Sequence, residues 1–131
     1  MCGVRRTSHQ RARMAELIDP AADTRATAWL ALADAGDGHG SWTAAGTAFR
    51  AAVSAERWTE QLSAARGPLG TLTSRALAVE QRLNGLPGAP PGEYVVRQYH
   101  SVYGGVKAVV ETLTLRREDD GAWRVVGYFI R

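Results

Sequence analysis

Apolar and polar residues alternate along the last part of the chain, a pattern typical of β-strands. Three such runs, at residues 94–103, 106–117 and 123–131, are rich in β-branched and aromatic residues. Gly104-Gly105 and Asp120-Gly121 separate them and suit the positive φ angles of tight turns. The pattern predicts three long antiparallel strands that form two consecutive hairpins.

An earlier run, residues 71–83, predicts a fourth strand that comes first in the chain. The alternation places one set of side chains on a common face: Thr71, Thr73, Arg75, Leu77 and Val79. Its alanine content also suits a helix over residues 75–82, so this is the strand with the weakest pattern. Residues 84–92 contain three prolines and predict a loop.

Hydrophobic residues recur at helical spacing before the first strand. Asp19-Pro20 suits a helix start and Gly36 a helix end, with an apolar stripe in between: Ala22, Ala26, Trp29, Leu30 and Ala33. Residues 37–40 are then expected to form a loop.

Ser41 is expected to cap a second helix, whose apolar stripe is Trp42, Ala45, Phe49 and Val53. Ser54 is expected to cap a third, whose stripe is Trp58, Leu62 and Ala65. Gly67-Pro68 is expected to end that third helix.

Helices followed by an uninterrupted run of strands indicate an α+β fold. We expect three N-terminal helices packed on one face of a curved, four-stranded antiparallel meander sheet. A chain of 131 residues suits one domain, placed at residues 19–131.

Residues 1–18 are expected to be a basic leader, disordered or the product of an over-assigned start codon. The first sixteen residues carry a net charge of +3, which is the formal charge of the whole chain. The neutral remainder argues against nucleic acid as a partner. An arm for an anionic partner is the alternative function for the leader. Cys2, the single cysteine, allows no internal disulfide, and a lipid-bearing role for it lacks the usual upstream motif.

Glu111 is the most informative polar position. Alternation places it on the same face as Val109, Leu113 and Leu115, so its carboxylate would be desolvated and would need a partner. Arg75 on the first strand or Arg97 on the second would supply one. Tyr99 and Tyr128, together with Tyr103, would line the mouth of a pocket, although aromatic packing alone also explains them. For Glu111, a structural ion pair or an inward charge protecting a sheet edge is the simpler alternative to a ligand or acid/base carboxylate.

The sequence contains no nucleophile elbow, P-loop, zinc-protease or Cys-x-x-Cys motif. His9, His39 and His100 are too far apart to form a metal-spaced pair. We therefore expect no cofactor and no metal. No apolar run is long enough to cross a membrane.

Several segments resemble the domain of unknown function 4019 family, in order and over about residues 26–131. They are Ala28–Asp37, Ser41-Trp42, Phe49-Arg50, Trp58, Arg66–Gly70, Ser74-Arg75, Pro87-Gly88, Gly92–Val96, Gln98-Tyr99, Val110–Thr112 and Trp123–Tyr128. The resemblance implies a small bacterial protein of unassigned activity with a cystatin-like or nuclear transport factor 2-like fold. It supplies no catalytic residues.

No signal peptide is visible, which indicates a cytoplasmic protein by default. Relatives in this family often carry export signals, so a misassigned start would make the protein periplasmic or secreted.

Two functions remain open at this point. The first is a non-enzymatic binding or interaction domain, with an unidentified small-molecule ligand or a homodimer through the exposed sheet face. The second is a small-molecule enzyme that uses Glu111 and a tyrosine partner in a cone-shaped cavity. The second rests on analogy between folds.

Overall fold

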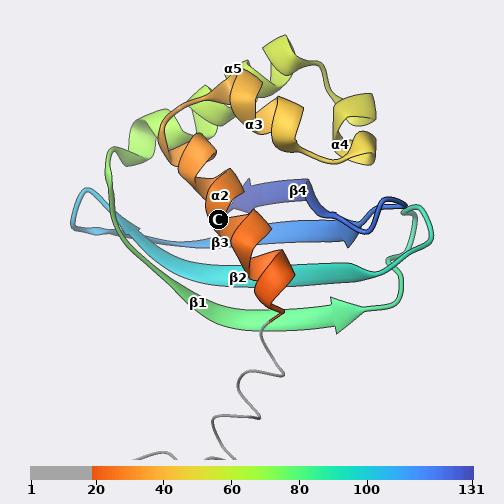
Figure 1. The fold of residues 1–131 in the computed structure, drawn as a ribbon. Coiled ribbons are helices and arrows are strands. Elements are labelled where there is room, and N and C mark those ends of the chain that lie inside the picture. Colours follow the sequence, from red (N-terminus) through yellow and green to blue (C-terminus); the bar gives the residue numbers. More distant parts are fainter. Residues whose placement is uncertain (1–18) are drawn as a thin grey trace, which may run out of the picture.

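The computed structural model describes residues 19–131. The expected leader, with Cys2 and His9, lies outside these residues. Helices lie on one face of a curved sheet (Figure 1). The elements in chain order are α2 (Pro20–Asp34), α3 (Gly38–Ala44), α4 (Thr47–Ala52), α5 (Ala55–Arg66), the 3-10 turn η1 (Gly67–Leu69), β1 (Leu72–Leu83), β2 (Tyr94–Tyr103), β3 (Lys107–Arg117) and β4 (Trp123–Ile130).

The strands follow the order β1-β2-β3-β4, and every neighbouring pair is antiparallel. This confirms the α+β class, the meander and all four strands, including the alanine-rich β1. Gly104, Gly105 and Gly121 adopt positive φ angles in the two turns that the sequence predicted.

The core lies between the helices and the inward face of the sheet. The α2 stripe is buried as predicted, and it packs on alternate residues of β2, β3 and β4. The alternation also gives the faces of β2 and β3 correctly: Val95, Tyr99, Glu111, Leu113 and Leu115 all point inward and are buried.

The predicted face of β1 is wrong at both ends of the strand. A register shift between Leu72 and Ser74 places Leu72 opposite the inward-facing Tyr103 and leaves Thr73 without a partner, and the predicted face is wrong again beyond Leu77. The β1–β2 register shifts between Leu77 and Val79, so Val79 points outward with 48% exposure and Glu80 points inward. A β-bulge inserts one residue and reverses the alternation after it. Arg75, which precedes this bulge, keeps its inward position opposite Ser101.

The second predicted helix is two helices in the structure. Asp37 caps α3 by accepting a hydrogen bond from the backbone N–H of Gly40, so the expected loop forms the first turn and Ser41 is not the cap. Ala45 and Gly46 are extended and end α3. The N–H of Gly46 donates to the carbonyl of Val125 at 2.7 Å, which fastens the chain between α3 and α4 to β4.

The third helix begins as predicted, because Ser54 accepts a hydrogen bond from the N–H of Arg57. Trp58 and Leu62 are buried. Ala65 is exposed, which corrects the predicted stripe.

Ser41 ties three helices together through tryptophan side chains. Its carbonyl accepts from Trp29 Nε1 and its hydroxyl from Trp58 Nε1, both at 2.9 Å. The hydroxyl in turn donates to the carbonyl of Gly38. Buried indole N–H groups need acceptors, so this serine fixes how α2 and α5 meet α3.

We expect Gly38→Ala to lower the free energy of unfolding by about 1–3 kcal/mol. A Cβ atom on Gly38 would lie 2.8 Å from the Cα atom of Thr59, a backbone atom that cannot rotate away. Urea denaturation measures the change. Gly85→Ala is the matched control, because a Cβ there meets nothing within 4 Å. Equal stability of both variants would contradict the close packing of α3 on α5.

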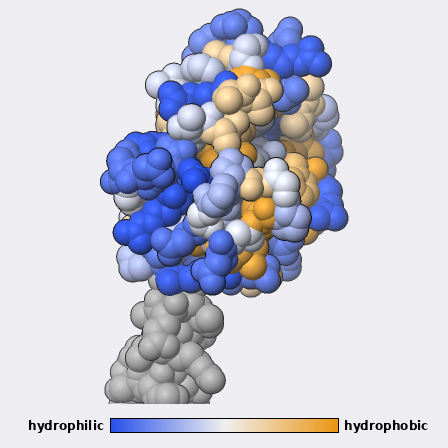
Figure 2. Space-filling view, turned by 90° about the vertical axis from the view of Figure 1, so that its right-hand side faces the viewer, coloured by the Kyte–Doolittle hydropathy of each residue, from blue (hydrophilic) through white to orange (hydrophobic). Residues whose placement is uncertain are grey.

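The outward face of the sheet carries one row of side chains across all four strands: Val79, Gln98, Thr112 and Phe129. The two hydrophobic ends of the row are about half exposed. From the side of the molecule where α4 and the β1–β2 loop lie, hydrophobic residues show in patches between hydrophilic ones (Figure 2). A homodimer through the outward sheet face stays a prediction.

Candidate functional site

The side chain of Glu111 is fully buried on the inward face of β3. Four side chains donate to its carboxylate. Arg75 donates through Nε and Nη2 at 2.8 and 3.1 Å, Tyr103 donates at 2.9 Å, and Ser101 and Tyr128 donate through their hydroxyls. This set fills the acceptor positions of a carboxylate.

Burial would raise the pKa of Glu111, but the hydrogen bonds from Arg75, Ser101 and Tyr128 outweigh it and hold the pKa below its usual value. The carboxylate is therefore charged at neutral pH. Burial and the charge of Glu111 raise the pKa values of Tyr103 and Tyr128, so both phenols keep their protons and remain donors.

Arg75 joins Glu111 to Asp34, the last residue of α2. Its Nη1 and Nη2 atoms donate to the two carboxylate oxygens of Asp34 at 2.9 and 2.8 Å. Arg66, the last residue of α5, donates to the same carboxylate at 2.7 Å. Burial would raise the pKa of Asp34, but both arginines lower it. Two helix ends and two strands thus meet in one network of alternating charges.

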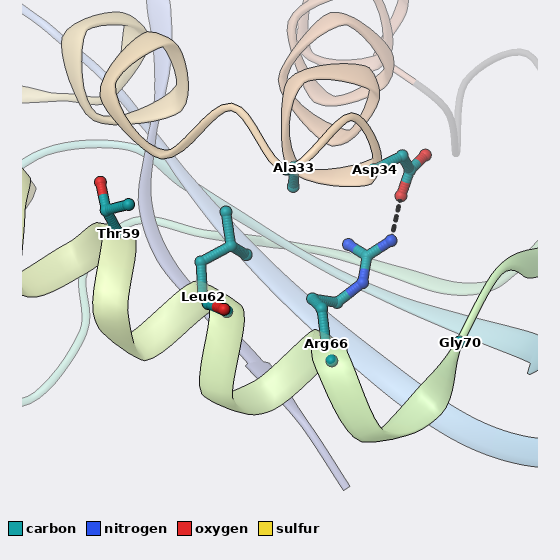
Figure 3. Close-up of a pocket in the computed structure, with 9 residues that line it drawn as sticks. Ala33, Asp34, Thr59, Leu62, Arg66 and Gly70 are labelled. Carbon is teal, nitrogen blue, oxygen red and sulfur yellow. Dashed lines mark hydrogen bonds and ion pairs between the residues drawn. The ribbon is translucent and has the colours of Figure 1, made fainter.

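Two cavities lie on either side of this network. The larger has a volume of about 390 Å³ and lies between α5 and the end of α2. Its lining is Ala33, Asp34, Gly36, Thr59, Leu62, Ser63, Arg66, Gly67 and Gly70. In Figure 3, Leu62 and Arg66 point from α5 toward the end of α2, where Arg66 meets Asp34. We call this the α2–α5 cavity.

The second cavity has a volume of about 330 Å³ and lies over β1 and β2. Arg75, Leu77 and Tyr99 line it, and Asp34 lines both cavities. Glu111 lines neither of them.

The structure separates the five residues that the sequence proposed for a pocket. Arg75 and Tyr128 contact Glu111. Tyr99 is opposite Glu111 in the register and lines the second cavity, where burial raises its pKa to about 12. Arg97 lies apart from the carboxylate of Glu111 and forms ion pairs elsewhere.

Arg97 is buried toward the other end of the sheet, with Asp23 at 2.8 Å and Glu80 at 3.4 Å. Burial raises the pKa of Glu80, and the charge of Arg97 only partly offsets this. The guanidinium lies 5.5 Å from the centre of the Tyr99 ring. Arg97 thus connects α2 to β1 and β2, through the half-exposed Asp23 and the buried Glu80.

The sequence model of a family described as a protein of unknown function (DUF4019) matches residues 25–128. The chain belongs to the DUF4019 family. The match includes every residue of the Glu111 network and both cavities. No curated protein and no solved structure matches the chain. The DUF4019 description assigns no activity, so the function has to be argued from the site.

Sequence reasoning did not propose Asp34 and Arg66 as site residues. The sequence contains one feature that could have identified Asp34 as a site residue, its position at the end of a helix. A carboxylate in the last turn of a helix opposes the helix dipole, so it indicates a cationic partner. Nothing in the local pattern identifies which of the arginines that partner is.

Within residues 19–131, no three histidine, cysteine, aspartate or glutamate side chains are placed to hold a metal ion. Among the helices of the same range, none combines the length and the apolar character needed to span a bilayer.

Proposed function

We propose that this protein is a small-molecule binding domain and that its ligand occupies the α2–α5 cavity. The observation that carries the proposal is the position of an ion pair, Asp34 with Arg66, in the wall of a cavity of about 390 Å³. Ligand pockets commonly have volumes of roughly 300–1,000 Å³, with apolar walls and a few fixed polar groups.

The network behind the cavity supports this proposal because it holds the polar wall in place. Arg75 fixes Asp34 from one side, and Asp34 fixes Arg66. Arg75 is itself held by the buried carboxylate of Glu111. A binding site gains affinity when its polar groups are oriented before the ligand arrives.

The enzymatic alternative requires Glu111 to be open to a cavity with a reacting group within hydrogen-bond reach. The carboxylate has 0% exposure and already accepts hydrogen bonds from four side chains. Its pKa is lowered, whereas a general acid or base at neutral pH needs a raised one. We therefore favour binding, with Glu111 as a structural anchor.

Native mass spectrometry of the gently purified protein tests the proposal. We expect to detect a bound small molecule, either co-purified or found by screening. The variant Ser63→Phe should no longer bind it. Ser63 is exposed at the rim of the α2–α5 cavity, so a phenyl group there fills the space at little cost to the fold.

Ala64→Phe is the matched control, because Ala64 is the exposed next residue of α5 and is absent from the cavity lining. Ligand retained equally by both variants would contradict the proposed site.

We also infer that residues 19–131 form one domain of the cystatin-like or nuclear transport factor 2-like kind. The support is a single core that runs from α2 through β4, with helices on one face of the meander (Figure 1).

A further inference from the structure

We propose that the ligand of the α2–α5 cavity is a small organic anion. Its carboxylate pairs with Arg66, and its hydrocarbon part lies against Ala33 and Leu62. This inference rests on the proposed function, because it names the ligand class of the same cavity.

Arg66 has donor capacity that its protein contacts do not use. A guanidinium carries five N–H groups. Arg66 donates to Asp34 at 2.7 Å and, at the long distance of 3.4 Å, to the hydroxyl of Tyr128. Its Nε atom is buried and has no partner among residues 19–131, so the donor capacity left for a ligand is on Nη1, whose hydrogen bond to Tyr128 is the long one. Arg75, by contrast, donates to Glu111 through Nε and Nη2 and to Asp34 through Nη1 and Nη2. Arg66 is therefore the arginine available to a ligand.

The two arginines and two carboxylates of the network balance in number, but Arg66 has only a share of one carboxylate as its counter-charge. The carboxylate of Glu111 accepts hydrogen bonds from Arg75 and from three hydroxyl groups. Asp34 forms ion pairs with both Arg66 and Arg75. Burial works to lower the pKa of Arg66, but Asp34 and the neighbouring tyrosines raise it, so the side chain stays a cation. A partly desolvated cation with a shared counter-charge favours an incoming anion.

The walls indicate an amphipathic ligand and not an inorganic ion. Ala33 and Leu62 supply buried apolar surface, and Thr59 and Ser63 add hydroxyl groups. Gly36, Gly67 and Gly70 contribute no side chains and leave room for the ligand.

The single arginine in the cavity wall favours a ligand with one negative charge over a ligand with two. A phosphate monoester would bring about two charges to a wall that offers one arginine beside Asp34. A cationic ligand is disfavoured, because the oxygens of Asp34 already accept three hydrogen bonds from two arginines. A monocarboxylate matches both the single guanidinium and the apolar walls.

The test is an amide-detected NMR titration with size-matched pairs of a carboxylate and its amide, hexanoate with hexanamide and benzoate with benzamide. We expect one of the carboxylates to shift the backbone signals of Ala33, Leu62, Gly67 and Gly70. It should bind at least about tenfold more tightly than its amide.

Arg66→Gln should remove this preference, and Arg66→Lys should keep part of it because the charge remains. Arg57→Gln, at an exposed position of α5 outside the cavity lining, should leave the preference unchanged.

The possible failures are distinguishable. Equal binding of an amide and its carboxylate in the cavity would overturn the proposed preference for an anionic ligand. The proposed binding function would still stand. Unchanged carboxylate binding by Arg66→Gln would overturn the role of Arg66. Absence of shifts at the cavity residues with all four compounds would overturn the inference, while native mass spectrometry tests the binding function separately.

Discussion

Replacing Glu111 with glutamine is expected to lower the free energy of unfolding by about 3–5 kcal/mol at neutral pH. Glutamine has nearly the same shape but offers one acceptor oxygen where the carboxylate offers two. Its NH₂ group would face Arg75, Ser101 or the two tyrosine hydroxyls, all of which are donors to Glu111 in the native structure. The partly buried guanidinium of Arg75 would also lose a counter-charge.

Urea denaturation of both proteins measures this change, and Glu93→Gln is the control. Glu93 forms an exposed ion pair with Arg117, so its replacement should cost less than about 1 kcal/mol. A Glu111→Gln variant as stable as the wild type, or more stable, would contradict the structural role. It would favour a functional carboxylate held at a cost in stability.

Trp58→Ala is expected to cost about 3–5 kcal/mol. The indole lies at the meeting point of helices and sheet, with its ring centre 4.9 Å from that of Phe49 and 6.0 Å from that of Trp29. Truncation would leave a large void and would deprive Ser41 of the indole donor. The void reduces stability, because the atoms that line it lose contacts and water fills such an apolar space poorly.

Trp58→Phe separates the two contributions, since it keeps an aromatic ring but removes the N–H donor. We expect a smaller loss than for alanine, measured by the same denaturation experiment. A loss below about 1 kcal/mol for Trp58→Ala would mean that α5 does not present this face to the core.

Strand alternation predicted the inward faces of β2 and β3 because both run without a bulge in the register between them. Glu111 followed directly from that alternation. The same reasoning failed at both ends of β1, before Ser74 and after Leu77, because a bulge depends on how two strands pair and leaves little trace in one strand's sequence.

The division of the second predicted helix escaped sequence analysis for a related reason. Residues 41–53 have helical spacing throughout, and Gly46 weakens a helix without requiring a break. What favours the break is a tertiary contact, the hydrogen bond from Gly46 to Val125 in β4. Local propensity gave way to backbone pairing between segments far apart in the chain.

Some features of the candidate site follow from the local sequence pattern, and others depend on contacts between distant segments. The need for a partner at Glu111 was predictable, because a buried carboxylate must be compensated. The choice of Arg75 over Arg97 was not, since both lie on inward faces and only the register decides. The meeting of Asp34 with Arg66 depends on how the ends of α2 and α5 approach, which no local pattern encodes.

We propose that Glu111 is a structural carboxylate and that ligand binding belongs to the neighbouring α2–α5 cavity. A direct measurement is the pKa of Glu111 from a ¹³C NMR titration of its side-chain carboxyl group. We expect a value below the ordinary glutamate value of about 4.3, because Arg75 and three hydroxyl groups stabilise the charged form. Glu111 then stabilises the fold above that ordinary pKa, and this stability is lost as the pH falls through the lower, native pKa. A measured pKa near neutrality would contradict the structural role of Glu111 and would mark it as a candidate general acid or base.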